Sequence, residues 1–157
     1  MECNDLIELV PLKEEFCQDV YDIARESLPE HWSLQGIKDV LKYENNIFFV
    51  AKHISTSQVI GFAGIMVIAD EAELLNIAVR QSYRRVGVAQ QLMTTVMERA
   101  KACGAIRMLL EVRMSNLGAM SLYRKNGFTD LSIRKNYYSN PREDALIMEC
   151  RWDYQIS

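Results

Sequence analysis

Residues 76–89 read Asn76-Ile77-Ala78-Val79-Arg80-Gln81-Ser82-Tyr83-Arg84-Arg85-Val86-Gly87-Val88-Ala89. A strand ends in the first four residues, a polar loop with two adjacent arginines follows, and small residues at 87 and 89 open a helical pattern. The first turn of a helix has unpaired N–H groups and a partial positive charge, so it attracts phosphate oxygens. The stretch therefore predicts an anion-binding loop between a strand and a helix. The alternative is a basic loop with a glycine at a helix start. The dinucleotide and P-loop glycine motifs are absent.

The apolar spacing on both sides of this stretch predicts the other elements. Strands are expected at 6–10, 47–52, 59–68, 73–79, 106–112, 128–134 and 145–152. Helices are expected at 13–28, 34–41 after a Ser33 cap, 87–104 and 117–126. The element order is β-α-α-β-β-β-α-β-α-β-β. It predicts a single α/β domain over residues 1–157, with a mixed sheet, an antiparallel meander and a later strand–helix–strand crossover.

The composition is that of an ordinary soluble protein. Of the 157 residues, 49% are hydrophobic and 25% charged, and the net charge is −3 with no basic block, which disfavours a nucleic-acid partner. The first ten residues carry acids, unlike a signal peptide, and no apolar run approaches the roughly 20 residues that span a membrane. The four cysteines show no C-x-x-C pair, so no metal site is expected. We expect a cytoplasmic monomer with free thiols.

A second candidate for chemistry is the stretch Leu110-Glu111-Val112. Strand alternation places Glu111 on the face opposite its apolar neighbours, where a carboxylate can act as a general base. The structural alternative is a solvated charge or an ion pair with Arg113. Asn116 is equally a helix cap, and Tyr123 lies on an apolar helix face where tyrosine is usually core. Singly, the structural alternatives are favoured.

The order of these motifs, taken together, resembles the GCN5-related N-acetyltransferase (GNAT) superfamily over nearly the whole chain, most specifically over 70–128. Within it, the chain is similar to the bacterial ribosomal-protein alanine N-acetyltransferases, the RimI family. Residues Met1–Val10 match poorly but carry no predicted chemistry. The residues that narrow the resemblance are Trp32-Ser33, Asp70–Val79, Leu110–Arg113, Leu122-Tyr123, Gly127-Phe128, Arg134–Tyr138 and Arg142–Ala145.

The resemblance implies acetyl-CoA as cosubstrate and no metal. It implies that the backbone of the strand at 77–79 pairs with the pantetheine arm and that the loop at 85–90 wraps the pyrophosphate. The positions that match acetyl-CoA contacts, together with Arg84 beside them, are Ile77, Ala78, Val79, Arg84, Arg85, Val86, Gly87, Val88, Ala89, Gln90 and Asn116.

The resemblance also implies the catalytic pair, with Glu111 as general base and Tyr123 as general acid in a direct transfer within a ternary complex. The implied acceptor is the N-terminal alanine of a small-subunit ribosomal protein. Trp32, Tyr137 and Tyr138 match residues that line the peptide, although they are equally well explained as core and rim aromatics. Two other functions stay open: acetylation of lysine or a small amine, and a CoA-binding module without turnover.

Overall fold

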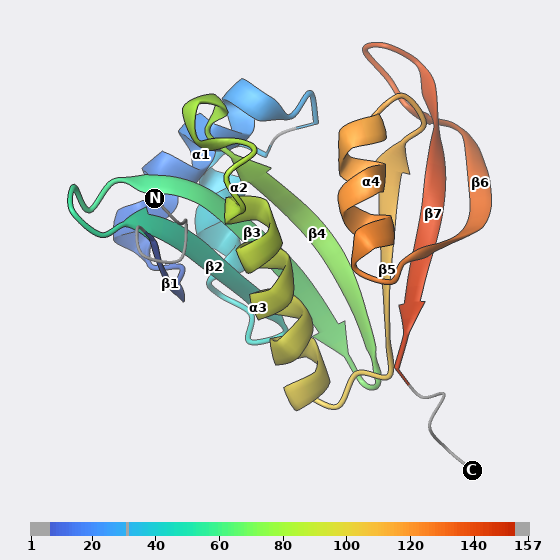
Figure 1. The fold of residues 1–157 in the computed structure, drawn as a ribbon, viewed down its shortest axis with the longest axis horizontal. Coiled ribbons are helices and arrows are strands. Elements are labelled where there is room, and N and C mark those ends of the chain that lie inside the picture. The colour runs from blue at the N-terminus through green and yellow to red at the C-terminus, as the bar shows by residue number, and fades with distance from the viewer. Residues whose placement is uncertain (1–6, 31, 153–157) are drawn as a thin grey trace.

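The computed structural model describes residues 7–30 and 32–152, which form one seven-stranded mixed sheet in the order β1-β2-β3-β4-β5-β7-β6 (Figure 1). The strands are β1 Ile7–Pro11, β2 Asn46–His53, β3 Val59–Ile68, β4 Glu71–Val79, β5 Arg107–Arg113, β6 Thr129–Tyr138 and β7 Glu143–Arg151. The helices are α1 Cys17–Ser27, α2 Leu34–Val40, α3 Val88–Ala102 and α4 Leu117–Lys125. Short 3-10 helices stand at Glu14–Phe16 and Gln81–Tyr83.

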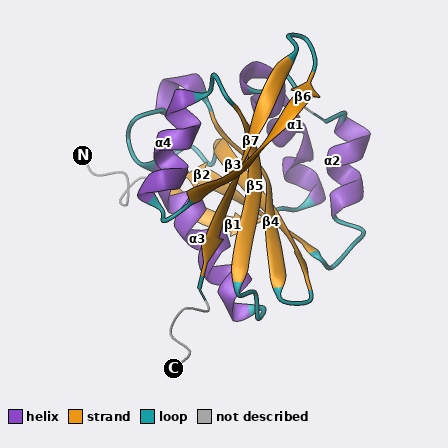
Figure 2. Ribbon diagram, turned by 90° about the vertical axis from the view of Figure 1, so that its right-hand side faces the viewer, coloured by secondary structure: helices purple, strands orange, loops and turns teal. Residues whose placement is uncertain are grey.

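The helices cover both faces of the sheet, with α1 and α2 on one face and α3 and α4 on the other (Figure 2). Each face has its own buried cluster. The α3 side chains of the larger cluster follow helical spacing, which is why this segment forms a helix on an apolar sheet. They are Val88, Leu92, Met93, Val96, Met97 and Ala100. The smaller cluster lies under α1 and α2 and includes Val20, Ile23 and Ile37.

The sheet divides at β4 and β5, the feature that creates room for a ligand. These parallel strands pair only at residues 71–73 of β4 with 107–109 of β5, and then they diverge (Figure 1). The register between β3 and β4 shifts after Gly64, so Leu75 has no partner on β3. A bulge of this kind increases local twist. Beyond Glu73, the edge of β4 that faces β5 is open.

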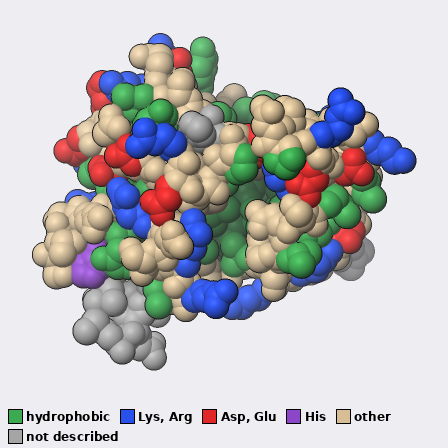
Figure 3. All heavy atoms as spheres, turned by 90° about the horizontal axis from the view of Figure 1, so that it is seen from above, with side chains coloured by type: hydrophobic (Ala, Val, Ile, Leu, Met, Phe, Trp, Pro, Cys, Tyr) green, Lys and Arg blue, Asp and Glu red, His purple; other side chains and the backbone are tan. Residues whose placement is uncertain are grey.

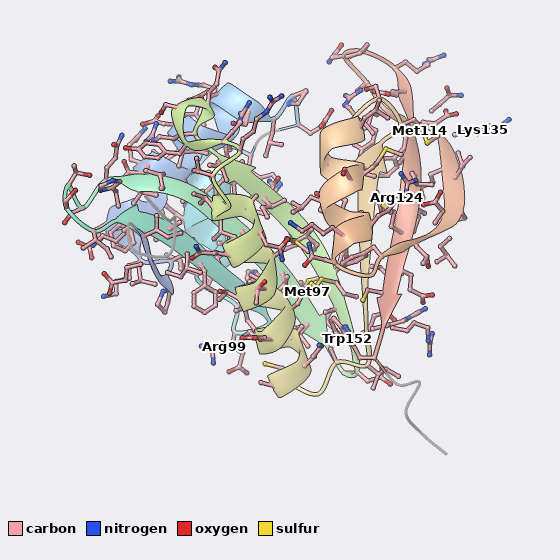
Figure 4. The ribbon with its side chains drawn as sticks, viewed as in Figure 1. Met97, Arg99, Met114, Arg124, Lys135 and Trp152 are labelled. Atoms are coloured by element: carbon pink, nitrogen blue, oxygen red, sulfur yellow. The ribbon has the colours of Figure 1, made fainter. Side chains whose placement is uncertain are left out.

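Side-chain contacts link β4, β5 and β7 at the end where β4 and β5 still pair. Arg107 on β5 pairs with Glu71 on β4 at 3.0 Å and with Glu149 on β7 at 2.8 Å. Trp152 lies at the same end (Figure 4), and its backbone N–H donates to the Ile106 carbonyl at 2.7 Å. The Lys101 ammonium lies 5.0 Å from the centre of the Trp152 ring. These contacts fix the apex from which β4 and β5 separate.

The predicted fold class is confirmed, including the β2–β3–β4 meander and the β4–α3–β5 crossover. The helix expected from Lys13 begins as a 3-10 turn, and the strand expected at 128–134 continues to Tyr138. Leu6, expected in the first strand, lies outside the described residues. Ser33 caps α2 as expected, since its Oγ accepts from the Gly36 N–H at 3.0 Å. Within 7–30 and 32–152, no helix is long and apolar enough to cross a membrane.

Gly64 on β3 lies against the buried ring of Phe48. A Cβ added at Gly64 would stand 2.2 Å from that ring, far closer than van der Waals contact. We therefore expect Gly64→Ala to lower the free energy of unfolding by about 1–3 kcal/mol, as overpacking of a core does. Gly118→Ala is the matched control, because its Cβ would meet nothing within 4 Å. Urea denaturation measures both variants, and equal unfolding free energies would contradict the overpacking.

Candidate active site

A cavity of about 1180 Å³ occupies the division between β4 and β5. It extends from the N-terminus of α3 and the helix α4 to the α1–α2 connection and the end of β6. Seen from above, the molecule is hollowed between its two halves, with hydrophobic side chains in the depression (Figure 3). Within the described residues, every predicted site residue lines this cavity except Val86 and Val88. Val86 is exposed and Val88 is buried in the core, and neither lines the cavity.

The α3 end of the cavity is an open helix N-terminus. Gly87 is the N-cap with φ 92°, and no described side chain caps the helix. The helix's first hydrogen bond runs from the Gln91 N–H to the Gly87 carbonyl, which leaves the preceding N–H groups available to an anion. A positive φ disfavours any side chain with a Cβ, so glycine is required here for conformation as well as for space.

The two arginines of the loop have different roles. The Arg84 guanidinium donates to the Val79 carbonyl at 3.0 Å and to Ser27 Oγ at 2.8 Å. It therefore fixes the loop to the end of β4 and to α1, although it also lines the cavity. Arg85 has no such contact among the described residues, and its charge stays available at the helix terminus.

A pair of amide side chains joins α3 to the end of α4, which the sequence motifs do not indicate. Gln90 donates to Asn126 Oδ1 at 2.8 Å, and Asn126 donates back to Gln90 Oε1 at 3.0 Å. Asn126 also donates to the Leu122 carbonyl at 2.8 Å. The pair couples the N-terminal turn of α3 to the helix that carries Tyr123. At the other end of α4, Asn116 accepts from the Ala119 N–H at 3.1 Å, so it caps the helix and lines the cavity as well.

Glu111 lines the cavity from β5, and its partly exposed side chain alternates with the buried Leu110 and Val112, which line the cavity as well. Its Oε1 accepts from Arg134 at 3.2 Å. The Tyr137 hydroxyl donates to the same carboxylate, and this hydrogen bond is the main reason that the pKa of Tyr137 is raised. The alternative of an ion pair with Arg113 is wrong. Two groups of β6 hold Glu111 in place, and neither is near it in sequence.

Arg113 instead joins three segments around the end of the cavity that Tyr137 and Tyr138 line. It donates to Glu30 in the α1–α2 connection at 2.8 Å and to Glu143 at the start of β7 at 3.0 Å. It also donates to the carbonyls of Ser139 and Pro141. Its guanidinium lies 4.5 Å from the centre of the Tyr138 ring. These contacts position the wall formed by β6 and β7.

Tyr123 on α4 is almost fully buried, with 6% of its surface exposed. Burial raises the pKa of Tyr123 to about 12, so its phenol is protonated throughout the neutral range. Its ring packs against Phe128 with 6.0 Å between centroids. Within the described part of the chain, no group forms a hydrogen bond to its hydroxyl, although the residue lines the cavity. A core tyrosine normally pairs its hydroxyl with protein, whereas this one has no such partner among the described residues.

The three aromatic residues matched to peptide binding lie at the same end. Tyr137 and Tyr138 form an edge-to-face pair with 4.9 Å between ring centroids. Trp32 packs against Phe48 at 5.8 Å and against the cluster under α1 and α2. All three line the cavity. Trp32 is therefore partly a core residue, and Tyr137 is engaged with Glu111 rather than free on the rim.

Comparison with known proteins identifies the family. A sequence model of the acetyltransferase (GNAT) family matches residues 17–128. The chain belongs to the GNAT family. It is 36% identical over 134 residues to the [ribosomal protein bS18]-alanine N-acetyltransferase of Haemophilus influenzae, spanning 83% of this chain and 89% of that one. It is 31% identical over 136 residues to the enzyme of that name from Salmonella typhimurium, spanning 80% and 92%.

Solved structures agree with this GNAT assignment. The ribosomal-protein-S18-alanine N-acetyltransferase of Escherichia coli superposes with a TM-score of 0.85 at 30% identity, covering 94% of each chain. Ard1 from Thermoplasma volcanium gives 0.85 at 28% identity, covering 93% of this chain and 97% of that one. The resemblance inferred from the sequence is confirmed, and the chain is an acetyltransferase of this family.

Several residues that shape the site were assigned no role in it from the sequence, namely Glu30, Glu73, Arg113 as a clamp, and Asn126. Their partners are distant in sequence, as with Arg113 and Glu30, so no local pattern could reveal them. The one available signal was the pair of acids at 71 and 73, unusual inside a strand of otherwise mostly apolar residues. In 7–30 and 32–152, no group of three His, Cys, Asp or Glu side chains is arranged to hold a metal ion.

Gly87→Glu tests the donor end of this GNAT site. The substitution places a carboxylate where an anion would approach the helix N-terminus, and we expect the Kd for acetyl-CoA to rise about tenfold or more. Gly104→Glu is the matched control, because Gly104 also has a positive φ, 94°, but lies beyond the far end of α3. Isothermal titration calorimetry on both folded variants measures the two affinities. Equal affinities would place the phosphate elsewhere.

Proposed function

We propose that this GNAT acetyltransferase transfers the acetyl group of acetyl-CoA to the α-amino group of an N-terminal alanine on a small-subunit ribosomal protein. One observation carries the proposal: a single cavity joins an open helix N-terminus and strand edge to a carboxylate and a buried phenol. The names of the relatives support the acceptor. Such an acceptor places the enzyme in the cytoplasm.

The residues at the α3 end fit acetyl-CoA. The N–H groups after Gly87, with Arg85 beside them, suit a pyrophosphate. The open edge of β4 at 77–79 suits the amides of a pantetheine arm, since an unpaired strand edge pairs with extended chains. When bound, acetyl-CoA supplies a thioester, an acetyl group already activated for transfer.

We assign Glu111 the role of general base. An α-amino group has a pKa of about 7.7–8.0 against about 10.4 for lysine, so it loses its proton far more readily at neutral pH. The carboxylate needs to accept that proton as the amine attacks. Arg134 and Tyr137 keep it facing the cavity, which fixes the direction of attack.

We assign Tyr123 the stabilisation of the departing thiolate. Its hydroxyl has no protein partner among the described residues and stays protonated, so it can donate to a sulfur that gains charge. Complete transfer of a proton from a phenol of pKa about 12 to a thiolate, whose conjugate thiol has a pKa of about 8.5, is uphill by roughly 5 kcal/mol. Tyr123 therefore acts as a hydrogen-bond donor to the departing thiolate rather than as a full proton donor.

The transfer is direct. Cys17, Cys103 and Cys150 are the cysteines in the described part of the chain, and none of them lines the cavity. In the described part of the chain, therefore, no thiol stands where it could carry an acetyl group between the two substrates.

The function is tested with peptides that share one sequence and differ in their first residue, each with an internal lysine. CoA release gives the rate and product mass gives the modified group. We expect the alanine peptide to be acetylated once, on its α-amine, and an Nα-blocked alanine peptide to be inert. Acetylation of the lysine in the blocked peptide would contradict the acceptor and favour a lysine acetyltransferase. Turnover of neither peptide, with acetyl-CoA bound, would favour a small amine or a binding module.

A further inference from the structure

The acidic side chains in the cavity and at its narrow end form ion pairs with arginines, with the exception of Glu73 among the described residues. Glu71 and Glu149 share Arg107, Glu111 pairs with Arg134, and Glu143 and Glu30 share Arg113. Glu73 lines the same cavity, yet no group in 7–30 or 32–152 forms a hydrogen bond or ion pair with its carboxylate.

Glu73 stands at the point where the cavity begins. It is the last residue of β4 that pairs with β5, opposite Leu109. Glu111 follows Leu109 by two residues, so strand alternation places Glu73 and Glu111 on the same face. Partial burial and the nearby Glu111 both raise the pKa of Glu73, and the charge of Arg134, which pairs with Glu111, offsets this only in part.

We propose that Glu73 binds the ammonium group of the acceptor and holds it beside Glu111 before the proton is removed. The inference rests on the proposed function and adds a residue that selects for a free, charged amino terminus. Arg134 forms its ion pair with Glu111 and acts on Glu73 without direct contact, so Glu73 provides the carboxylate that no ion pair engages. The ammonium group of the bound acceptor displaces water and forms an ion pair with the Glu73 carboxylate. The attraction between the two charges is weakly screened in the cavity.

This role differs from that of a second base. Glu73 contributes to binding of the charged acceptor, whereas Glu111 takes the proton. Its loss should therefore weaken the binding of acceptors that carry an ammonium group and leave neutral analogues unaffected. The neighbouring Glu71 lies on the same strand and face but pairs with Arg107 outside the cavity, so it provides a matched control.

The test uses two peptides of identical sequence, one beginning with alanine and the other with a propionyl group, which is alanine without its amine. Their Kd values are measured by calorimetry on the enzyme–CoA complex, in which no acetyl group can be transferred. We expect the wild type and Glu71→Gln to prefer the alanine peptide. In Glu73→Gln we expect that preference to fall about tenfold, the loss typical of a hydrogen bond to a charged group. The Kd for acetyl-CoA should be unchanged, which also shows that the variant is folded.

The outcomes separate this role from the proposed function. An unchanged preference in Glu73→Gln, or an equal loss for both peptides, would contradict the ammonium-binding role. A wild-type enzyme that shows no preference but still acetylates the alanine peptide would contradict the role of Glu73 and leave the proposed function standing. A wild type that prefers the ammonium but does not acetylate the alanine peptide would overturn the proposed acceptor and leave the role of Glu73 supported.

Discussion

Glu111→Gln lowers the rate of acetyl transfer by about 10²–10⁴-fold at neutral pH, the usual loss when a general base is removed. Glutamine has the same shape and can still accept hydrogen bonds from Arg134 and Tyr137, so the wall of the cavity should keep its geometry. The Kd for acetyl-CoA should stay within about twofold of the wild-type value, because the carboxylate acts on the amine. Single-turnover measurements with the alanine peptide give the rate of the chemical step.

The pH dependence separates loss of a base from loss of structure. Raising the pH converts more of the acceptor to the neutral amine, whose pKa is about 8, so the Glu111→Gln rate should rise toward that of the wild type. A damaged fold would not recover in this way. Glu149→Gln serves as a control, because Glu149 lies on the same face but pairs with Arg107 outside the cavity. A Glu111→Gln enzyme as fast as the wild type at neutral pH would remove Glu111 from the mechanism.

Tyr123→Phe lowers the single-turnover rate by about 10²-fold or more while the Tm stays nearly constant. The substitution keeps the ring and its packing on Phe128 and removes only the hydroxyl. That hydroxyl bonds to no described protein group, so its removal should cost less than the 0.5–1.5 kcal/mol of a typical hydrogen bond. Single-turnover conditions are needed because slow product release would otherwise hide a slower chemical step.

The matched control for Tyr123→Phe is Tyr43→Phe, since Tyr43 is 64% exposed and lies outside the cavity. It should change neither the rate nor the Tm. Normal chemistry in a folded Tyr123→Phe enzyme would return this tyrosine to a purely structural role. A fall in Tm together with the rate would show that the hydroxyl supports the fold.

The helices and strands of this protein follow from local sequence patterns that do not depend on tertiary contacts. Helical spacing in 88–102, the glycine that opens that helix and alternation around Glu111 are all properties of neighbouring residues. They were sufficient for the mixed sheet, the crossover and the family. They also placed Glu111 and Tyr123 on the elements where the structure has them. Element ends were less certain, as the longer β6 shows, because strand length depends on pairing with β7.

The sequence by itself determined the fold, the family and the identity of the groups that could act. Only the tertiary structure decided what each of those groups touches. In the folded protein Arg113 pairs with Glu30 and Glu143 rather than with Glu111, and Arg84 contacts Ser27. Glu73 forms no ion pair with any described residue. The reason is physical: secondary structure depends on residues a few positions apart, whereas charge pairing depends on distances between side chains of distant segments, which only the folded chain brings together.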